Sequence, residues 1–120
     1  MSLTTIALIC LLLHFVADFN LQGMLKDLKQ KVWWENNYPD KKYRYDYQTA
    51  GWIHAFMWSI FTFLPFVTHP YYEWIVMINA VIHYVIDNFK ANELKLSLTQ
   101  DQVFHLVQIW ATVPVFVFCG

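Results

Sequence analysis

The sequence has little charge, little glycine and few cysteines. Only 14% of its 120 residues are charged, the net charge is −1 and the pI is about 6.5, which excludes a basic nucleic-acid-binding protein. Two cysteines exclude a disulfide scaffold, and three glycines leave no glycine-rich phosphate-binding loop. The 58% hydrophobic content excludes an intrinsically disordered chain.

Hydrophobic residues fill four long runs instead. The runs cover about residues 3–22, 49–68, 71–90 and 99–118. A helix that crosses a bilayer needs roughly 20 residues, which each run supplies. The sequence therefore predicts an all-α protein, a single integral membrane domain over residues 1–120 in which four transmembrane helices form a bundle. A soluble all-helical metal protein is the alternative, and it would need a large partner to cover its apolar surface.

The segment over residues 23–48 differs sharply from these runs because it is rich in lysine, tryptophan and tyrosine. Around its start, Leu21, Leu25, Leu28 and Val32 recur at helical spacing, which predicts an amphipathic helix in the headgroup layer. A solvated loop with some helix is the alternative. Because cytoplasmic loops collect basic residues, we expect a multi-pass protein of the bacterial inner membrane with both termini outward.

Seven ionisable side chains interrupt the apolar runs, and each needs a functional reason because it is costly to place in lipid. They are His14, Asp18, His54, His83, Asp87, Asp101 and His105. The first and third runs read His-x-x-x-Asp, and the fourth, which runs the opposite way, reads Asp-x-x-x-His. This order predicts one shared layer near the cytoplasmic face. The repeated His-x-x-x-Asp also predicts two parallel helical hairpin repeats.

Three carboxylates in one layer of low dielectric constant need cations to balance them. Imidazole and carboxylate groups are ligands that Zn²⁺, Mn²⁺ and Fe²⁺ favour, so all seven residues are candidate ligands of divalent metal, with room for two ions. The aspartates Asp18, Asp87 and Asp101 are also the candidate catalytic residues. A hydrogen-bonded polar network without metal is the alternative.

Residues flanking this layer are candidates for supporting roles. Lys90 lies near Asp87 on the same helix face and is a candidate phosphate-binding residue, or it is a lysine that marks the end of a span. Gln22 and Gln102 are candidates to orient the carboxylates, or they are span ends. Cys10 and Cys119 form either a disulfide or two buried thiols. We assign His69 no role.

Several motifs together resemble a family of small bacterial and phage membrane proteins, domain of unknown function family 3307. They are His14-x-x-x-Asp18 followed by Leu21-Gln22, a histidine early in the second run, His83-x-x-x-Asp87-x-x-Lys90 and Asp101-Gln102-x-x-His105. The resemblance covers essentially the whole chain. The family is distantly similar to membrane-bound metal-dependent hydrolases, which implies metal-assisted hydrolysis by analogy. One departure is Gly23-Met24-Leu25, where family members tend to have a tryptophan.

These features predict a membrane metalloprotein that hydrolyses a phosphoester or other ester at the cytoplasmic interface. The expected partners are the lipid bilayer and a lipid or phosphoester substrate, and no nucleic acid. The alternative is a non-enzymatic metal-binding membrane protein, which would be a sensor, a transport component or a phage-encoded binder of a host membrane protein. The sequence does not determine the metal, the substrate or the oligomeric state.

Overall fold

The computed structural model describes residues 2–20, 23–93 and 96–118, and their regular elements are all helical. The long helices are α1 (Leu3–Phe15), α4 (Asp46–Thr62), α5 (Tyr72–Ala91) and α6 (Leu98–Phe118). The π-helical turn η1 (Val16–Asn20) continues α1. The short helices are α2 (Leu25–Leu28), α3 (Lys31–Asn37), and the 3₁₀ turns η2 (Lys41–Tyr43) and η3 (Leu64–Phe66).

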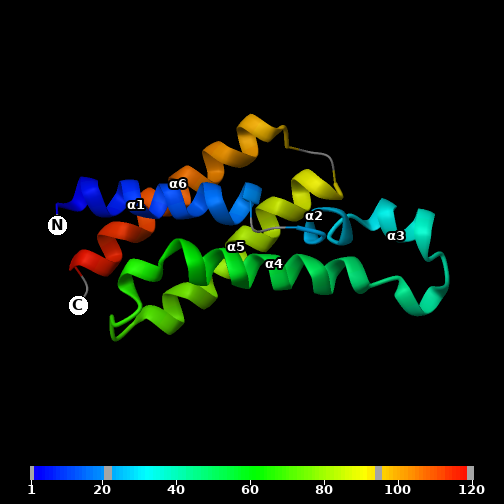
Figure 1. The fold of residues 1–120 in the computed structure, drawn as a ribbon, viewed down its shortest axis with the longest axis horizontal. Coiled ribbons are helices and arrows are strands. Elements are labelled where there is room, and N and C mark those ends of the chain that lie inside the picture. Colours follow the sequence, from blue (N-terminus) through cyan, green and yellow to red (C-terminus); the bar gives the residue numbers. More distant parts are fainter. Residues whose placement is uncertain (1, 21–22, 94–95, 119–120) are drawn as a thin grey trace.

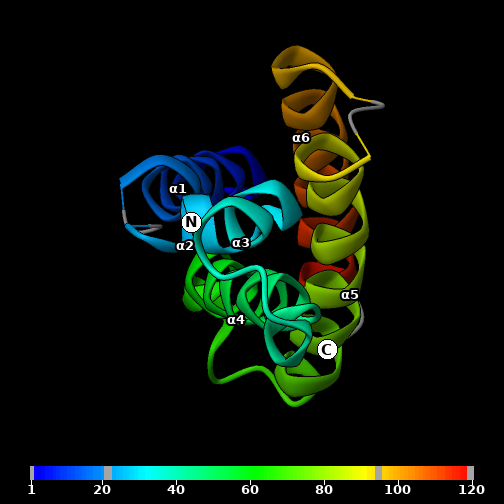
Figure 2. The same ribbon diagram turned by 90° about the vertical axis from the view of Figure 1, so that its right-hand side faces the viewer.

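The four long helices pack in a ring, in which α1 contacts α4 and α6, and α5 contacts the same two helices (Figures 1 and 2). Residues of the apolar core face the centre of this ring near the start of α1 and the end of α6. Trp58, Ile109, Val113 and Phe116 are at most 2% exposed there. The core occupies one end of the ring, which leaves the other end for polar side chains.

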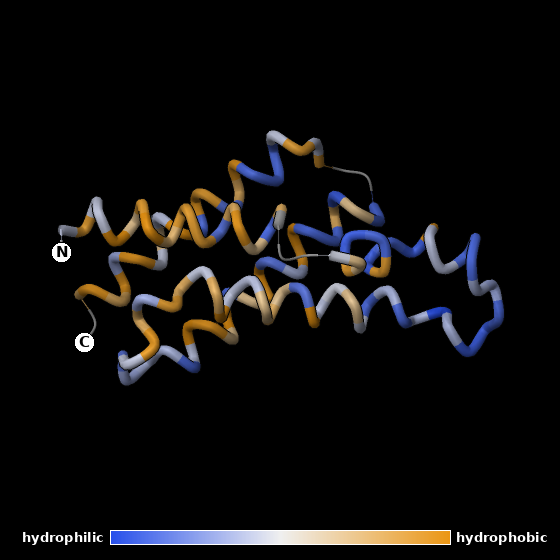
Figure 3. Tube along the Cα trace, viewed as in Figure 1, coloured by the Kyte–Doolittle hydropathy of each residue, from blue (hydrophilic) through white to orange (hydrophobic). Residues whose placement is uncertain are grey.

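Helices α2 and α3 and the turn η2 lie at this other end, where hydrophilic residues dominate the chain (Figure 3), whereas η3 lies at the apolar end, where Phe66 stacks on Phe116. Gly23, at φ 54°, precedes α2 in a left-handed conformation that glycine adopts without strain. Helices α2 and α3 follow with four and seven residues. The prediction of one amphipathic helix in the headgroup layer is therefore wrong, and α2 packs against α4 instead.

The prediction of four transmembrane helices is wrong as well. Among the described residues, α6 is the one helix that is both long and apolar enough to cross a membrane, and core helices pass the same test. Helix α4 ends after 17 residues at Thr62, and α5 carries Glu73, Asp87 and Lys90. The predicted multi-pass location in a bacterial inner membrane, with both termini outward, depended on these four helices and is therefore wrong too.

The prediction of two parallel helical hairpin repeats is also wrong, because the two His-x-x-x-Asp motifs differ in local structure. The first His-x-x-x-Asp motif runs from the end of α1 into the π-helical turn η1, whereas the second lies wholly within the regular helix α5. The hydrophobic content led to a wrong prediction because the helices of a small helical protein can carry as many apolar side chains as membrane-spanning helices do. Some of these side chains are buried and others are exposed.

Candidate metal centre

All four long helices contribute to the polar end of the ring. His14 lies in the last turn of α1, Asp18 lies in η1, and His54 lies in α4. Helices α5 and α6 each contribute a pair four residues apart, which places both side chains of a pair on one helix face. These pairs are His83 with Asp87 and Asp101 with His105. All seven side chains that the sequence singled out are buried.

Six of the seven residues meet in three overlapping groups, in each of which the potential ligand atoms lie within 4.8 Å of one another. The groups are Asp18, His54 and His83; His83, Asp87 and His105; and Asp18, Asp101 and His105. Three residues belong to two groups each, so the groups form one continuous set. We call these six residues the His/Asp cluster.

Short distances run through the cluster. Asp18 Oδ1 lies 3.2 Å from His54 Nε2 and 3.8 Å from His83 Nε2. Asp101 Oδ1 lies 3.2 Å from His105 Nε2. The His83 ring is stacked against both Trp58 and His105, with centroids 4.2 Å apart in each case. These stacks hold the His83 imidazole between two fixed rings.

Both ring nitrogens of His83 are buried without a hydrogen-bond partner among the described residues. His105 Nε2 and Asp101 Oδ1 are buried as well and have each other as partners, at 3.2 Å. A buried polar group left without a partner costs about 1–3 kcal/mol, so such atoms are rare in native proteins. Nitrogen and carboxylate donors that point into a shared space fit a divalent cation, which would satisfy them together.

Burial and neighbouring charges set the protonation of the cluster. Burial, together with the nearby His105, holds the pKa of His83 well below its usual value. His83 is therefore neutral at neutral pH, and a neutral imidazole is the form that binds metal. Burial alone would raise the pKa of Asp18, but the hydrogen bond from His54 and the charges around it hold that pKa below its usual range. Asp18 therefore stays ionised.

His14 is not available as a ligand, although the sequence predicted it to be one. Trp58 Nε1 donates a hydrogen bond to His14 Nδ1 at 2.7 Å. An indole nitrogen can only donate, so His14 Nδ1 accepts and His14 Nε2 carries the proton. His14 Nε2 accordingly donates to Gln102 Oε1 at 2.9 Å. With both nitrogens occupied, His14 supports the cluster from outside it.

Gln102 lies where a residue that orients the carboxylates should lie. Its Nε2 atom donates to Asp18 Oδ2 at 3.0 Å and to Asp101 Oδ2 at 3.1 Å, while its Oε1 atom accepts from His14. One amide therefore links η1, α1 and α6. Gln22, the other residue predicted for this role, lies outside the described residues, as does Cys119 of the predicted cysteine pair.

Sequence reasoning missed Lys29. This side chain is 8% exposed, and its Nζ atom donates to Asp87 Oδ2 at 2.7 Å. Asn92, at the end of α5, positions it by donating to the Lys29 carbonyl at 2.9 Å and by accepting from the Lys31 amide at 2.6 Å. The available signal was that Lys29 follows Leu25 by four residues, which puts it on the inward face of the helical pattern.

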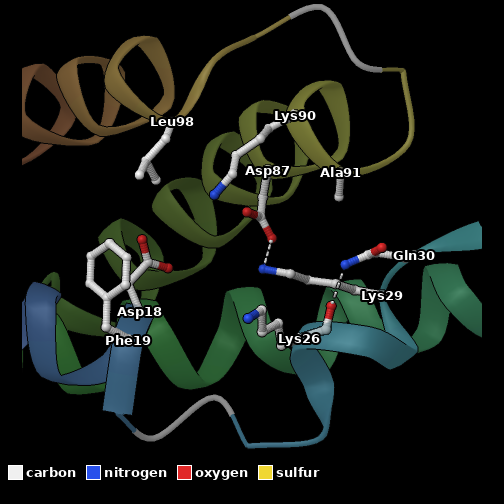
Figure 4. Close-up of a pocket in the computed structure, with 9 residues that line it drawn as sticks. All are labelled: Asp18, Phe19, Lys26, Lys29, Gln30, Asp87, Lys90, Ala91 and Leu98. Carbon is white, nitrogen blue, oxygen red and sulfur yellow. Dashed lines mark hydrogen bonds and ion pairs between the residues drawn. The ribbon is translucent and has the colours of Figure 1, made fainter. Parts of the chain in front are cut away.

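A cavity of about 470 Å³ opens beside the cluster. Asp18 and Asp87 line it and so connect it with the cluster, and three lysines from α2, the residue after α2, and α5 surround it (Figure 4). The lysines are Lys26, Lys29 and Lys90. The Lys90 Nζ atom lies 3.5 Å from Asp101 Oδ2, so the predicted phosphate-binding lysine does reach both cluster and cavity.

Two other residues take no part in the cluster. His69 accepts a hydrogen bond from the Tyr71 amide at 3.0 Å in the turn before α5, and it belongs to none of the three groups. Cys10 is fully buried in the apolar core, and burial raises the pKa of its thiol to about 11. Both positions are consistent with structural roles.

The chain matches no known protein family, no curated protein and no solved structure. The resemblance to domain of unknown function family 3307 therefore stays a prediction that depends on the motifs alone.

Proposed function

We propose that this protein binds divalent metal ions at the His/Asp cluster and uses them to hydrolyse an ester bound in the adjacent cavity. The observation that carries the proposal is His83, whose two ring nitrogens are buried without a hydrogen-bond partner among the described residues. His83 shares one group of potential ligands with Asp87 and His105, and Asp101 shares another with Asp18 and His105, so cations in these two groups would use the nitrogen and oxygen atoms together.

The donor set favours Zn²⁺, Mn²⁺ or Fe²⁺, which accept nitrogen and oxygen ligands together. Three overlapping groups provide more donors than a single tetrahedral ion needs, so two ions are the expected content. Metal ions at such a site lower the pKa of bound water and stabilise the negative charge that develops during ester hydrolysis.

The residues around the cluster have separate tasks in this proposal. Gln102 orients the carboxylates of Asp18 and Asp101 through its two hydrogen bonds. Asp18 and Asp87 face both cluster and cavity, so the reaction takes place at this boundary. Trp58, which is fully buried and stacked on His83, keeps water from that side of the site, which strengthens electrostatic interactions there.

Metal analysis of the purified protein tests the binding site. We expect about two equivalents of a transition metal in the wild-type protein, as in other two-metal sites, and a loss of at least one equivalent in His83→Gln. His69→Gln is the matched control, because it removes a histidine that also has an unpartnered buried nitrogen but lies outside the three groups. Wild-type protein that stays metal-free after incubation with Zn²⁺, Mn²⁺ and Fe²⁺ would rule the site out.

Turnover tests the activity separately. Metal-loaded protein is assayed with p-nitrophenyl phosphate and p-nitrophenyl acetate, with Asp87→Asn as the inactive reference. We expect release of nitrophenol that stops when a chelator removes the metal. Full metal content without turnover of either ester would favour a non-enzymatic metal-binding protein, the second candidate, which is supported by the complete burial of His83, Asp101 and His105.

A further inference from the structure

We infer that the cavity beside the His/Asp cluster binds the phosphate group of a phosphomonoester, through Lys29 and Lys90. This inference rests on the proposed hydrolysis and names its substrate class. In the reaction, the oxygen of water forms a bond to phosphorus, the bond from phosphorus to the alcohol oxygen breaks, and the alcohol leaves with a proton from that water.

The lysines can bind a phosphate without giving up their present partners. Lys29 Nζ donates one hydrogen bond to Asp87, and an ammonium group has three protons to donate. Lys90 Nζ lies 3.5 Å from Asp101, and the Lys90 side chain is one third exposed and lines the cavity, so its ammonium group has protons to donate to a ligand there. Both side chains therefore hold a fixed charge at the boundary where the proposed reaction occurs (Figure 4).

The charge balance favours a dianion over a neutral ester. Three aspartates of the cluster carry −3, and the three lysines that line the cavity carry +3, so the site is neutral without metal when the histidines are neutral. One divalent ion brings the total to +2, and two bring it to +4. A phosphomonoester carries about −1.5 to −2 near neutral pH, so it offsets the charge of one ion and about half the charge of two, whereas an uncharged ester would offset none of it.

The rest of the cavity suits an apolar substituent on the phosphate. Phe19, Ala91 and Leu98 also line it, with Phe19 and Leu98 on the same side (Figure 4), and its volume of about 470 Å³ is within the range of small-molecule sites, roughly 300–1,000 Å³. A phosphate that carries an aryl or acyl group would place its charge on the lysines and its apolar part against Phe19 and Leu98.

Titration calorimetry with inorganic phosphate tests the inference on metal-free and Mn²⁺-loaded protein. We expect the Mn²⁺-loaded wild-type protein to bind phosphate at least about tenfold more tightly than Lys29→Met and Lys90→Met do, since each variant loses a charge-assisted hydrogen bond. Lys31→Met is the control, because Lys31 is exposed and does not line the cavity. Lys90→Met removes a partly exposed side chain and remains informative if Lys29→Met fails to fold.

The outcomes separate this inference from the proposed function. If the protein binds Mn²⁺ but the affinity for phosphate is equal in wild type, Lys29→Met and Lys90→Met, the phosphate site is overturned. The metal site would not be affected by that result. Lysine-dependent phosphate binding in a protein that takes up no metal would support the phosphate site and overturn the hydrolase. Absence of phosphate binding in both states would overturn the inference.

A second arm identifies the source of the phosphate. Phenyl phosphate and a short-chain phosphatidate are compared as substrates of the Mn²⁺-loaded protein, both with the same lysine variants. Turnover that depends on Lys29 supports a phosphomonoester site. The substrate that is turned over faster shows whether the ligand is a soluble ester or a lipid headgroup. Turnover of p-nitrophenyl acetate alone would contradict the substrate class.

Discussion

At the scale of single residues, Gln102 and Trp58 decide what the histidines can do. Trp58 can only donate, which forces the tautomer of His14 and, through it, the orientation of the Gln102 amide. Gln102 then has its Nε2 atom directed at the two aspartates. A chain of donors and acceptors therefore holds the two carboxylates in place, while both ring nitrogens of His83 stay available.

Gln102→Ala removes this orientation without removing any candidate ligand. We expect the affinity for Mn²⁺ to fall about 10- to 100-fold, the effect typical of residues that hold metal ligands in place. Helical content measured by circular dichroism should not change. Gln48→Ala is the control, because Gln48 lies in the first turn of α4 and bonds the Tyr47 hydroxyl. Equal Mn²⁺ affinity in wild type and Gln102→Ala would show that Gln102 does not orient the ligands.

Cys10 allows a prediction about pH. The folded thiol keeps its proton up to about pH 11, whereas an unfolded thiol loses it near its ordinary pKa of 9.0. The unfolded state therefore binds fewer protons above pH 9.0, and this thiol makes the free energy of unfolding fall as the pH rises towards 11. Urea unfolding of a Cys119→Ser protein, with Cys10→Ala/Cys119→Ser as control, measures the difference.

At the scale of elements, the helix ends and the π-helical turn η1 determine where the side chains of the His/Asp cluster lie. In α5 and α6 a spacing of four residues is enough to align histidine and aspartate. In η1 the wider turn changes the direction of Asp18 relative to His14, so Asp18 reaches His54 while His14 faces Trp58. Such π-helical turns occur frequently at functional sites.

The contact between α4 and α5 is close enough to need a glycine. A Cβ atom at Gly51 would lie 2.8 Å from Tyr84 Cε2, and the Tyr84 ring is already stacked on Trp52 at 4.1 Å. We expect Gly51→Ala to lower the free energy of unfolding by about 1 kcal/mol, because overpacking outweighs the gain in helix propensity. Urea unfolding measures this change.

The Tyr84→Ala background provides the control for Gly51. With the ring removed, Gly51→Ala should raise the free energy of unfolding by up to about 1 kcal/mol, the helix propensity gain alone. The same effect in both backgrounds would mean that Tyr84 moves aside without cost.

At the scale of the whole molecule, the fold separates an apolar core at one end of the ring from the polar cluster at the other. At the polar end, potential metal ligands from η1, α4, α5 and α6 lie close to one another. Metal ions would connect these four elements there. Binding to the folded state alone therefore stabilises the whole chain.

We expect Mn²⁺ at about 100 times its dissociation constant to raise the free energy of unfolding by about 2.7 kcal/mol. Asp101→Asn should lose this gain, because it removes a carboxylate from the group that includes Asp18 and His105. Urea unfolding with and without the ion measures the effect. A gain of equal size in Asp101→Asn would place the bound ion elsewhere.

Much of the candidate site was predictable from local patterns. Histidine and aspartate at a spacing of four, in both orders along the chain, predicted that their side chains would share helix faces and one layer, and five of these six residues do meet, together with His54. The membrane interpretation failed because hydropathy measures composition, and composition does not determine whether a helix packs in a small protein or spans a bilayer.

The sequence by itself determined the helical class and the positions of histidine and aspartate on the helices, because these follow from the local spacing of residues. Only the tertiary structure decided that His14 bonds Gln102 across 88 residues and that Lys29 bonds Asp87 across 58. It also decided where the cavity lies. Contacts at such separations depend on how helices pack, and helix packing depends on the shapes of many side chains at once.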